Sequence, residues 1–240
     1  MSHPERRTVF QVSLMAGLLD GVYDGDATVG QLLDRGDFGL GTFNALDGEM
    51  IILDSVVHRL RSGGEATSVG PEEPTPFAIV TRFSPSITVD VPGGAGRDEV
   101  AGMVDRLVST NYLYAMRITG RFAAVKTRAV VRQEKPYRPL VEVTRGEPTL
   151  GLSDVDGVIA GFRTPLYQQG IGVPGGHVHF IDTDRRRGGH VLDFELAGGT
   201  LELCLGTDLH LALPLSDSFA DARLTPDDLG TQVEQAERHR

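Results

Sequence analysis

Residues 175–194 read GGHVHFIDTDRRRGGHVLDF and hold three of the seven histidines of the chain. His177 and His179 are two positions apart, so on a β-strand both side chains project from one face, about 6.5–7 Å apart along the chain. The β-branched and aromatic residues of HVHFI favour a strand. The polar interval DTDRRRGG is long enough to turn the chain back and to place His190 on a partner strand. The stretch therefore predicts a β-hairpin whose three imidazoles converge.

Converging neutral imidazoles form the protein half of a zinc site with open coordination positions. A lone histidine such as His58 or His210 is ordinarily structural or solvent-facing, and His3 and His239 lie near the chain ends. The His-x-His pair recurs by chance, so the metal prediction depends on the third histidine of the next predicted strand. The three arginines of the hairpin are interpreted as its solvated tip.

A site of three histidines does not by itself name a reaction. Zinc hydration enzymes, cupin-type oxygenases and metal-assisted decarboxylases all use histidine ligands of this kind. The cupin pattern requires a glutamate a few positions after the second histidine. This chain has Thr183 and Asp184 there, so a cupin is a poor fit.

The composition excludes several classes of protein. A formal net charge of -10 argues against non-specific binding to nucleic acid or to an acidic membrane surface. The single cysteine, Cys204, excludes an internal disulfide framework, suits the reducing cytosol and is predicted to be a small core residue. The sequence shows no signal-peptide pattern and no run of the roughly eighteen apolar residues that a membrane span needs. A soluble cytoplasmic protein is therefore expected.

The 30 glycines and 13 prolines favour a protein rich in strands and turns over a helical bundle. Residues 10–35 are predicted to be largely helical, with Thr28 as an N-cap and Gly36 as a stop. Asp47-Gly48 is a hairpin dipeptide, and the β-branched run that follows it predicts a buried strand.

Later segments continue this mixed pattern. RDEVAGMVDRLVST repeats apolar positions at helical spacing and predicts a helix. Residues 114–133 are predicted to form a hairpin that turns at Thr119-Gly120. Thr225-Pro226, followed by two aspartates, predicts the start of a terminal helix.

These elements predict an α/β protein of the α+β kind, with two sheet-based halves of mostly antiparallel and mixed β-sheet and a few flanking helices. The segment KPYRPL, bracketed by two prolines, is the predicted linker. We expect an N-terminal mixed-sheet domain over 1–135 that carries Glu49 and Arg128. A C-terminal β domain over 136–240 is expected to carry the histidine hairpin and a C-terminal helix.

Four separated stretches together resemble the α-acetolactate decarboxylase family. They are GLGTFNALDGEMIILD, AVKTRAVVRQEKPYRPL, the histidine hairpin and VEQAER near the C-terminus. The similarity covers essentially the whole chain, and GTFNALDGEM together with HVHFID is specific. The resemblance implies a homodimeric carboxy-lyase that converts 2-acetolactate to (R)-acetoin and carbon dioxide, in acetoin and butanediol biosynthesis.

The resemblance also implies one Zn2+ ion as the cofactor and a set of site residues. Three histidines would bind the metal, two glutamates would act as further ligands or proton donors, and an arginine and a threonine would bind the substrate. These residues are His177, His179, His190, Glu49, Glu237, Arg128 and Thr42.

The sequence around Glu49 agrees with an inward orientation but does not require it. Glu49 opens a predicted strand whose same-face partners Ile51 and Leu53 are apolar. Since glutamate is usually exposed, a solvent-facing side chain after the turn is the alternative.

The tail offers two glutamates, and the helical pattern distinguishes them. Leu229, Val233 and Glu237 recur on one stripe of the predicted helix, whereas Glu234 lies on the other face. Glu237 is therefore the inward candidate, and a frayed terminal residue is the alternative.

Arg128 is predicted to share a strand face with Lys126 and Val130. A guanidinium donates two parallel hydrogen bonds to a carboxylate, which a lysine point charge cannot do. Lys126 or Arg132 could take the same role, and a surface arginine is the alternative. Thr42 precedes the predicted hairpin and is also explained as a turn residue.

The implied chemistry needs positive charge beside the substrate. Loss of carbon dioxide leaves an electron pair that delocalises into the neighbouring ketone as an enediolate, which an open three-histidine metal would stabilise. Arg128 would orient the departing carboxylate, while Glu49 and Glu237 would bind the metal or relay protons. The sequence leaves open which glutamate does which. Asp182 and Asp193, or backbone carbonyls, would accept the imidazole N–H groups.

Two other functions stay open at this point. One is a different metal enzyme on the same scaffold, such as a hydrolase or an oxygenase. The other is a non-catalytic, metal-stabilised binding protein whose coordination positions are all closed by the chain.

Overall fold

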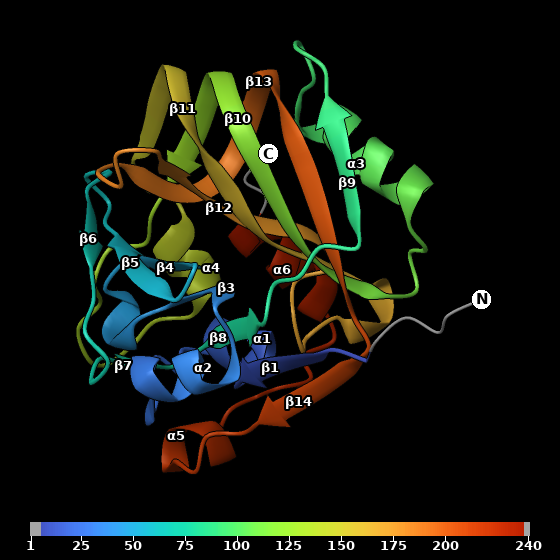
Figure 1. The fold of residues 1–240 in the computed structure, drawn as a ribbon. Helices are drawn as coiled ribbons and strands as arrows, with labels where there is room; N and C mark the ends of the chain where they lie inside the picture. The colour runs from blue at the N-terminus through green and yellow to red at the C-terminus, as the bar shows by residue number, and fades with distance from the viewer. Residues whose placement is uncertain (1–5, 238–240) are drawn as a thin grey trace.

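Two β-sheets contain most of the strands, and short helices flank them (Figure 1). The structure is a computed structural model and describes residues 6–237. The mixed, sheet-dominated architecture predicted from the sequence is confirmed. Within the described residues, every helix is too short or too polar to cross a membrane.

The first sheet has seven strands and combines the N-terminal part of the chain with one late strand. Its spatial order is β14 (Asp208–Ala212), β1 (Thr8–Val12), β8 (Ala78–Thr81), β3 (Phe38–Thr42), β4 (Glu49–Leu53), β5 (Val56–Leu60) and β6 (Ala66–Ser68). β14 runs parallel to β1, and the other neighbours are antiparallel. β2 (Ala27–Thr28) and β7 (Pro74–Thr75) pair separately.

The second sheet has five strands and closes on itself. Its order is β10 (Leu113–Arg128), β11 (Thr149–Thr164), β12 (Gly175–Asp182), β13 (Gly188–Gly206) and β9 (Ile87–Val91). β10 and β12 each pair with both β11 and β13, so these four strands form a small barrel. Its apolar core includes Phe122 and Phe180, and α3 (Arg97–Leu107) packs on this core through Val100 and Val104.

The two sheets pack against each other. Leu40 and Ile51 of the seven-stranded sheet share one buried cluster with Phe162 and Ile181 of the five-stranded sheet. The removal of these side chains from water holds the sheets together. As a result β4 contacts β12, which brings the strand of Glu49 against the strand that carries His177 and His179.

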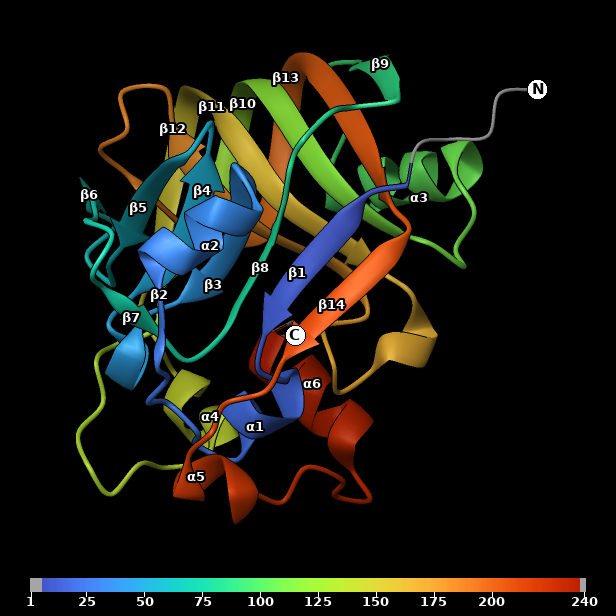
Figure 2. The ribbon, with the colours of Figure 1, turned by 60° about the horizontal axis from the view of Figure 1, so that its bottom comes forward.

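Three helices lie together beside the site region (Figure 2). α1 (Met15–Leu19), α4 (Leu140–Thr144) and α6 (Leu229–Glu237) contact one another and share an apolar cluster that includes Leu46 and Val130. The remaining helices are α2 (Val29–Arg35), α5 (Asp217–Ala220) and the 3-10 helices η1 (Asn44–Leu46) and η2 (Leu166–Gln168).

Several local predictions are confirmed. Thr28 caps α2, because its hydroxyl accepts from the backbone N–H of Gln31 while the Gln31 side chain accepts from Thr28 N–H, and Gly36 ends this helix. The helix predicted in RDEVAGMVDRLVST is α3, and Cys204 is buried in the core between the sheets.

Two local predictions are wrong. The start of the segment 10–35 is not helical, because residues up to Val12 form β1, which pairs on both sides with β14 and β8. The chain also does not turn at Thr119-Gly120, since β10 runs through this point as one strand. Gly120 instead allows a close approach of strands, because a Cβ there would lie 2.4 Å from the carbonyl oxygen of Gly198.

The two sheets do not follow the expected division of the chain at residue 135. β9 and β10 precede this position but belong to the five-stranded sheet, and β14 follows it but belongs to the seven-stranded sheet. Arg128 therefore lies in the same sheet as the histidine hairpin. Whether 1–135 and 136–240 behave as separate folding units stays a prediction.

Candidate functional site

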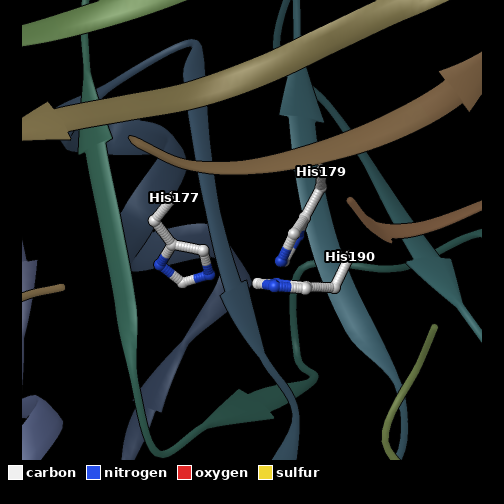
Figure 3. Close-up of side chains that lie close together, drawn as sticks. All are labelled: His177, His179 and His190. Carbon is white, nitrogen blue, oxygen red and sulfur yellow. The ribbon is translucent and has the colours of Figure 1, made fainter. Parts of the chain in front are cut away.

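The three histidines of the hairpin meet at one point between the sheets. His179 on β12 is paired in register with His190 on β13, and His177 lies two residues before His179. One ring nitrogen from each lies within 4.8 Å of the others. Figure 3 shows the three rings turned toward a common centre. Period-two alternation and hairpin pairing produce this convergence, as the sequence predicts.

Burial keeps these imidazoles neutral. Together with Arg128 and Arg97, burial lowers the pKa of His177 to about 3. Burial also lowers the pKa of His179 and His190 well below the usual histidine value. Neutral imidazole is the form that binds a metal ion, because a protonated ring has no free lone pair.

The hydrogen bonds of His179 indicate which of its ring nitrogens is free to bind a metal ion. Its Nδ1–H donates to the carbonyl oxygen of Met50 at 2.7 Å, which leaves Nε2 with a free lone pair. Nε2 is buried and has no hydrogen-bond partner within residues 6–237. A buried acceptor without a donor is costly, and a cation held by the three rings would satisfy it. The donor set therefore fits a metal ion.

Two buried carboxylates lie beside the histidines. Oε2 of Glu49 is 3.6 Å from Nε2 of His179, and Oε2 of Glu237 is 3.5 Å from Nε2 of His177. Both glutamates are only 7% exposed. Burial raises the pKa of Glu49 to about 8, although Arg128 opposes this shift. Glu237 also contacts the hairpin through its backbone, because Nε2 of His190 lies 3.2 Å from its carbonyl oxygen.

The loop between β3 and β4 sets the position of Glu49. Gly48 adopts a φ of +98°, and a Cβ there would lie 2.7 Å from the carbonyl oxygen of Leu60, so glycine is required. The Thr42 hydroxyl donates to the carbonyl oxygen of Gly48 at 2.8 Å. Thr42 thus closes the turn that leads into Glu49, as the turn-residue interpretation expects, and it also lines the pocket.

Arg128 is buried and held on two sides. Its Nη1 donates to Oε2 of Glu147 at 2.7 Å, and its Nη2 donates to the carbonyl oxygen of Ala236 at 2.6 Å. Burial alone would lower the pKa of Arg128, but Glu237, Glu49 and Glu147 together raise it. This arginine therefore connects the end of β10 to α6 and stays charged.

Lys126 and Arg132, the alternatives to Arg128, are both exposed. The expectation that Lys126 and Arg128 share a strand face agrees with their uninterrupted pairing with Gly151 and Thr149 of β11, yet only Arg128 is buried. The pairing of β10 with β13 shifts register between Lys126 and Thr127, because Leu192 of β13 is left unpaired there, which is a bulge in β13. Arg128 is paired with His190 of β13 beyond this bulge.

The aspartates flanking the histidines do not contact the imidazoles. Asp182 accepts from the backbone N–H groups of Arg186 and Arg187 and thereby stabilises the hairpin turn, while Asp193 accepts from Phe194 N–H. A backbone carbonyl, that of Met50, takes the imidazole N–H of His179 instead, which is the other option that the sequence left open.

A pocket opens beside the histidines, and about 400 Å³ within its bounds is free of protein atoms, part of which is open solvent. Its lining combines polar groups with an apolar wall, which suits a small molecule that has both kinds of surface. The lining residues are Met15, Leu18, Gly41, Thr42, Leu46, Glu49, Phe77, Arg128, Val130, Leu140, Thr144, His177, His190 and Glu237.

The sequence analysis missed two residues of this region, Glu147 and Thr144. Glu147 lies in an irregular segment after α4, and no periodic pattern marks it as the partner of Arg128. Thr144 is the last residue of α4. Only the packing of α4 against α1 and α6 brings this segment to the pocket.

Fold and site together define a sheet-based protein with a three-histidine centre able to hold a metal ion beside a small-molecule pocket. The alpha-acetolactate decarboxylase family profile matches residues 9–226. The alpha-acetolactate decarboxylase of Klebsiella aerogenes is 42% identical over 98% of this chain and 90% of its own length. The enzyme of that name from Bacillus subtilis (strain 168) is 42% identical over 95% and 90%.

Solved structures agree with the sequence relatives. The crystal structure of alpha-acetolactate decarboxylase from Bacillus subtilis strain 168 has a TM-score of 0.94 at 42% identity, covering 96% of this chain and 99% of that one. A Staphylococcus aureus protein described as similar to alpha-acetolactate decarboxylase has a TM-score of 0.92 at 30% identity, covering 96% and 100%. The chain belongs to the alpha-acetolactate decarboxylase family. The predicted resemblance and the predicted class, a decarboxylating lyase, are confirmed.

Proposed function

We propose that this chain decarboxylates 2-acetolactate to (R)-acetoin and carbon dioxide with a zinc ion bound by His177, His179 and His190. The observation that carries the proposal is a set of three neutral imidazoles, two buried and one half-buried, beside a buried arginine and two buried glutamates. The relatives of known name act, by that name, on acetolactate. The metal, when bound, supplies positive charge that stabilises the negative charge developing on the substrate oxygens.

Zinc is favoured by the chemistry of the donors. Neutral nitrogen ligands with a nearby carboxylate and an open position are typical of catalytic zinc sites. A thiolate is not among the converging side chains, so the ion would keep most of its charge. Metal analysis of the purified protein by mass spectrometry should find about one zinc ion per chain.

Arg128 is proposed to bind the carboxylate of the substrate. It is 3% exposed and lines the pocket that contains His177 and His190. Its two fixed Nη groups hold the guanidinium plane in one orientation. A fixed cation aligns the C–C bond that breaks, so that its electron pair can move into the neighbouring ketone.

Glu49 and Glu237 are proposed to share two tasks, completing the metal surroundings and moving a proton. The carbon that loses carbon dioxide must gain one proton to give acetoin. Each glutamate has a carboxylate oxygen within 4 Å of a histidine nitrogen. In the metal-free protein burial raises the pKa of Glu49 to about 8, which supports a role for this carboxyl in binding and releasing a proton. Thr42 is proposed to bind the substrate alongside its role in the turn.

The deciding experiment incubates the purified protein with racemic 2-acetolactate without oxygen and follows acetoin by chiral gas chromatography. We expect (R)-acetoin, loss of activity with a zinc chelator and recovery on adding zinc. A hydrolase or an oxygenase would not release acetoin under these conditions. A protein that binds metal but yields no acetoin would be the non-catalytic binding protein, and the proposal would fail.

The assembly and the location of the enzyme stay predictions. We propose a homodimer in the cytoplasm that serves acetoin and butanediol biosynthesis, binding neither nucleic acid nor membrane. Light scattering coupled to gel filtration measures the assembly directly, and a mass of one chain would contradict the dimer.

A further inference from the structure

Thr144 carries a buried hydroxyl that has no hydrogen-bond partner within residues 6–237. It is the last residue of α4, and the side chain is 1% exposed. Its Oγ1 finds neither donor nor acceptor in the described part of the chain. Unpaired buried hydroxyls are rare and costly in folded proteins, so each one calls for a reason.

Thr144 also lies in the wall of the pocket. Thr144 lines it together with Arg128, His177 and Glu237. A group that enters this pocket therefore meets a residue whose hydroxyl has no hydrogen-bond partner among residues 6–237.

Arg128, which lines the same pocket, carries a second unused donor. Nε of Arg128 is buried and unpartnered within residues 6–237, although both Nη groups are bound. One short segment links the two donors. The backbone N–H of Glu147 donates to the carbonyl oxygen of Thr144 at 3.4 Å, and the Glu147 carboxylate accepts from Arg128.

The chemistry of the two donors selects their common acceptor. The Nε–H of arginine can only donate, and a carboxylate can only accept and has two oxygens to share. In 2-acetolactate the carboxylate is the group that leaves as carbon dioxide, and acetoin lacks it.

We infer that Thr144 is a substrate-binding residue whose hydroxyl donates to the carboxylate of the substrate, next to the Nε–H of Arg128. The inference rests on the proposed function and adds to it a residue that distinguishes substrate from product. Once carbon dioxide has left, neither donor has its acceptor, and acetoin is held by the rest of the pocket alone.

The test replaces Thr144 by valine, which keeps the branched shape and removes the hydroxyl. Thr127→Val is the matched control, because Thr127 is also 1% exposed and its hydroxyl is also unpaired within residues 6–237, but it does not line the pocket. Thr144→Ser restores a hydroxyl. KM and kcat for 2-acetolactate, the inhibition constant of acetoin and the metal content are measured for each zinc-loaded protein.

We expect Thr144→Val to raise KM for 2-acetolactate about tenfold or more, as for a lost hydrogen bond to a charged group. The inhibition constant of acetoin and the metal content should stay within about twofold of the wild-type values, as should every parameter of Thr127→Val. Thr144→Ser should recover most of the affinity. If the valine variant does not fold, Thr144→Ala removes the same hydroxyl with a smaller side chain.

Three results would overturn the inference. An unchanged KM in a folded Thr144→Val protein would show that the hydroxyl does not contact the substrate. Equal weakening of acetolactate and acetoin would place the hydroxyl on the part that they share. An equal effect of Thr127→Val would indicate a general packing effect. In each case wild-type turnover continues, whereas a wild-type protein without acetolactate turnover would refute the proposed function itself.

Discussion

At the scale of single residues, the site depends on charges removed from water. Glu49, Glu237 and Arg128 all line the pocket, so two carboxyl groups and one guanidinium lie at a single buried site. Burial drives Glu49 toward its protonated form and the histidines toward their neutral form. A bound cation reverses this preference at Glu49, because it favours the ionised carboxylate. Metal binding should therefore release protons near neutral pH.

The first prediction concerns the hairpin itself. Replacing His179 by alanine removes one of three nitrogen ligands and should abolish both bound metal and acetoin formation. Metal content per chain and activity are measured side by side. His210→Ala is the control, because His210 is an exposed histidine far from the hairpin in the first sheet. Retention of metal and activity in His179→Ala would show that the three rings are not the metal site.

The second prediction concerns Glu147, the partner of Arg128. Glu147→Ala leaves a buried guanidinium short of its carboxylate and should lower the free energy of unfolding by about 3–5 kcal/mol. Glu147→Gln keeps an acceptor and should cost less. Urea unfolding of the three proteins measures the effect. If alanine costs no more than the roughly 0.5 kcal/mol of a surface substitution, the ion pair does not stabilise the fold.

The third prediction is a pH dependence of the metal-free protein. The pKa of Glu49 rises from 4.5 to about 8 on folding, so between these values the folded state binds a proton that the unfolded state lacks. This contribution to stability is present below pH 4.5 and is lost as the pH rises toward 8. Glu49→Gln cannot titrate and should show a flatter pH profile. Equal profiles of the thermal midpoint for both proteins would contradict the assignment.

At the scale of elements, two local patterns orient the side chains of the site: the alternation of β12 and the helical periodicity of α6. Strand periodicity sets the two histidines of β12 on one face, and a slip of one residue would turn both to the other face. Helix periodicity does the same for α6, where Val233 and Glu237 are buried while Glu234 is exposed. Each pattern extends over a few residues, and each turns a side chain toward the histidine site.

The fourth prediction uses the two faces of α6. Glu237→Gln should lower kcat about tenfold to a hundredfold or more, as removal of a group that handles a proton does. Glu234→Gln is the matched control, because it changes the same side chain on the exposed face of the same helix. Steady-state kinetics with 2-acetolactate measure both variants. Similar kinetics for the two would show that the tail does not contribute to catalysis.

At the scale of the whole molecule, the site lies where parts distant in the sequence meet. The histidines come from the five-stranded sheet, Glu49 from the seven-stranded sheet and Glu237 from the last helix. A metal ion held there would contact groups from all three parts. It would bind the folded chain far more tightly than the unfolded one, so its binding energy would add to the stability of the fold.

The fifth prediction follows from this linkage. At a free metal concentration about a thousand times Kd, binding should add about 4 kcal/mol to the stability of the folded state. Differential scanning calorimetry should therefore show a lower thermal midpoint after chelation and a return when zinc is added. His179→Ala should show no shift with zinc. A midpoint that does not respond to zinc in the wild-type protein would contradict a metal site at the junction of the sheets.

The sequence by itself determined the features that depend on short spacing. Periodicities of two or about three and a half residues predict the His-x-His hairpin, the helix α3 and the inward face of α6. The cap of α2 follows from its residue types, threonine at the start and glycine at the end. The resemblance to the family followed from whole motifs. Tertiary structure alone decided how β10 pairs, that Arg128 is buried against Glu147, and that Thr144 lines the pocket. The reason is that such contacts join residues far apart in the chain, and packing and burial select them, whereas local spacing does not encode them.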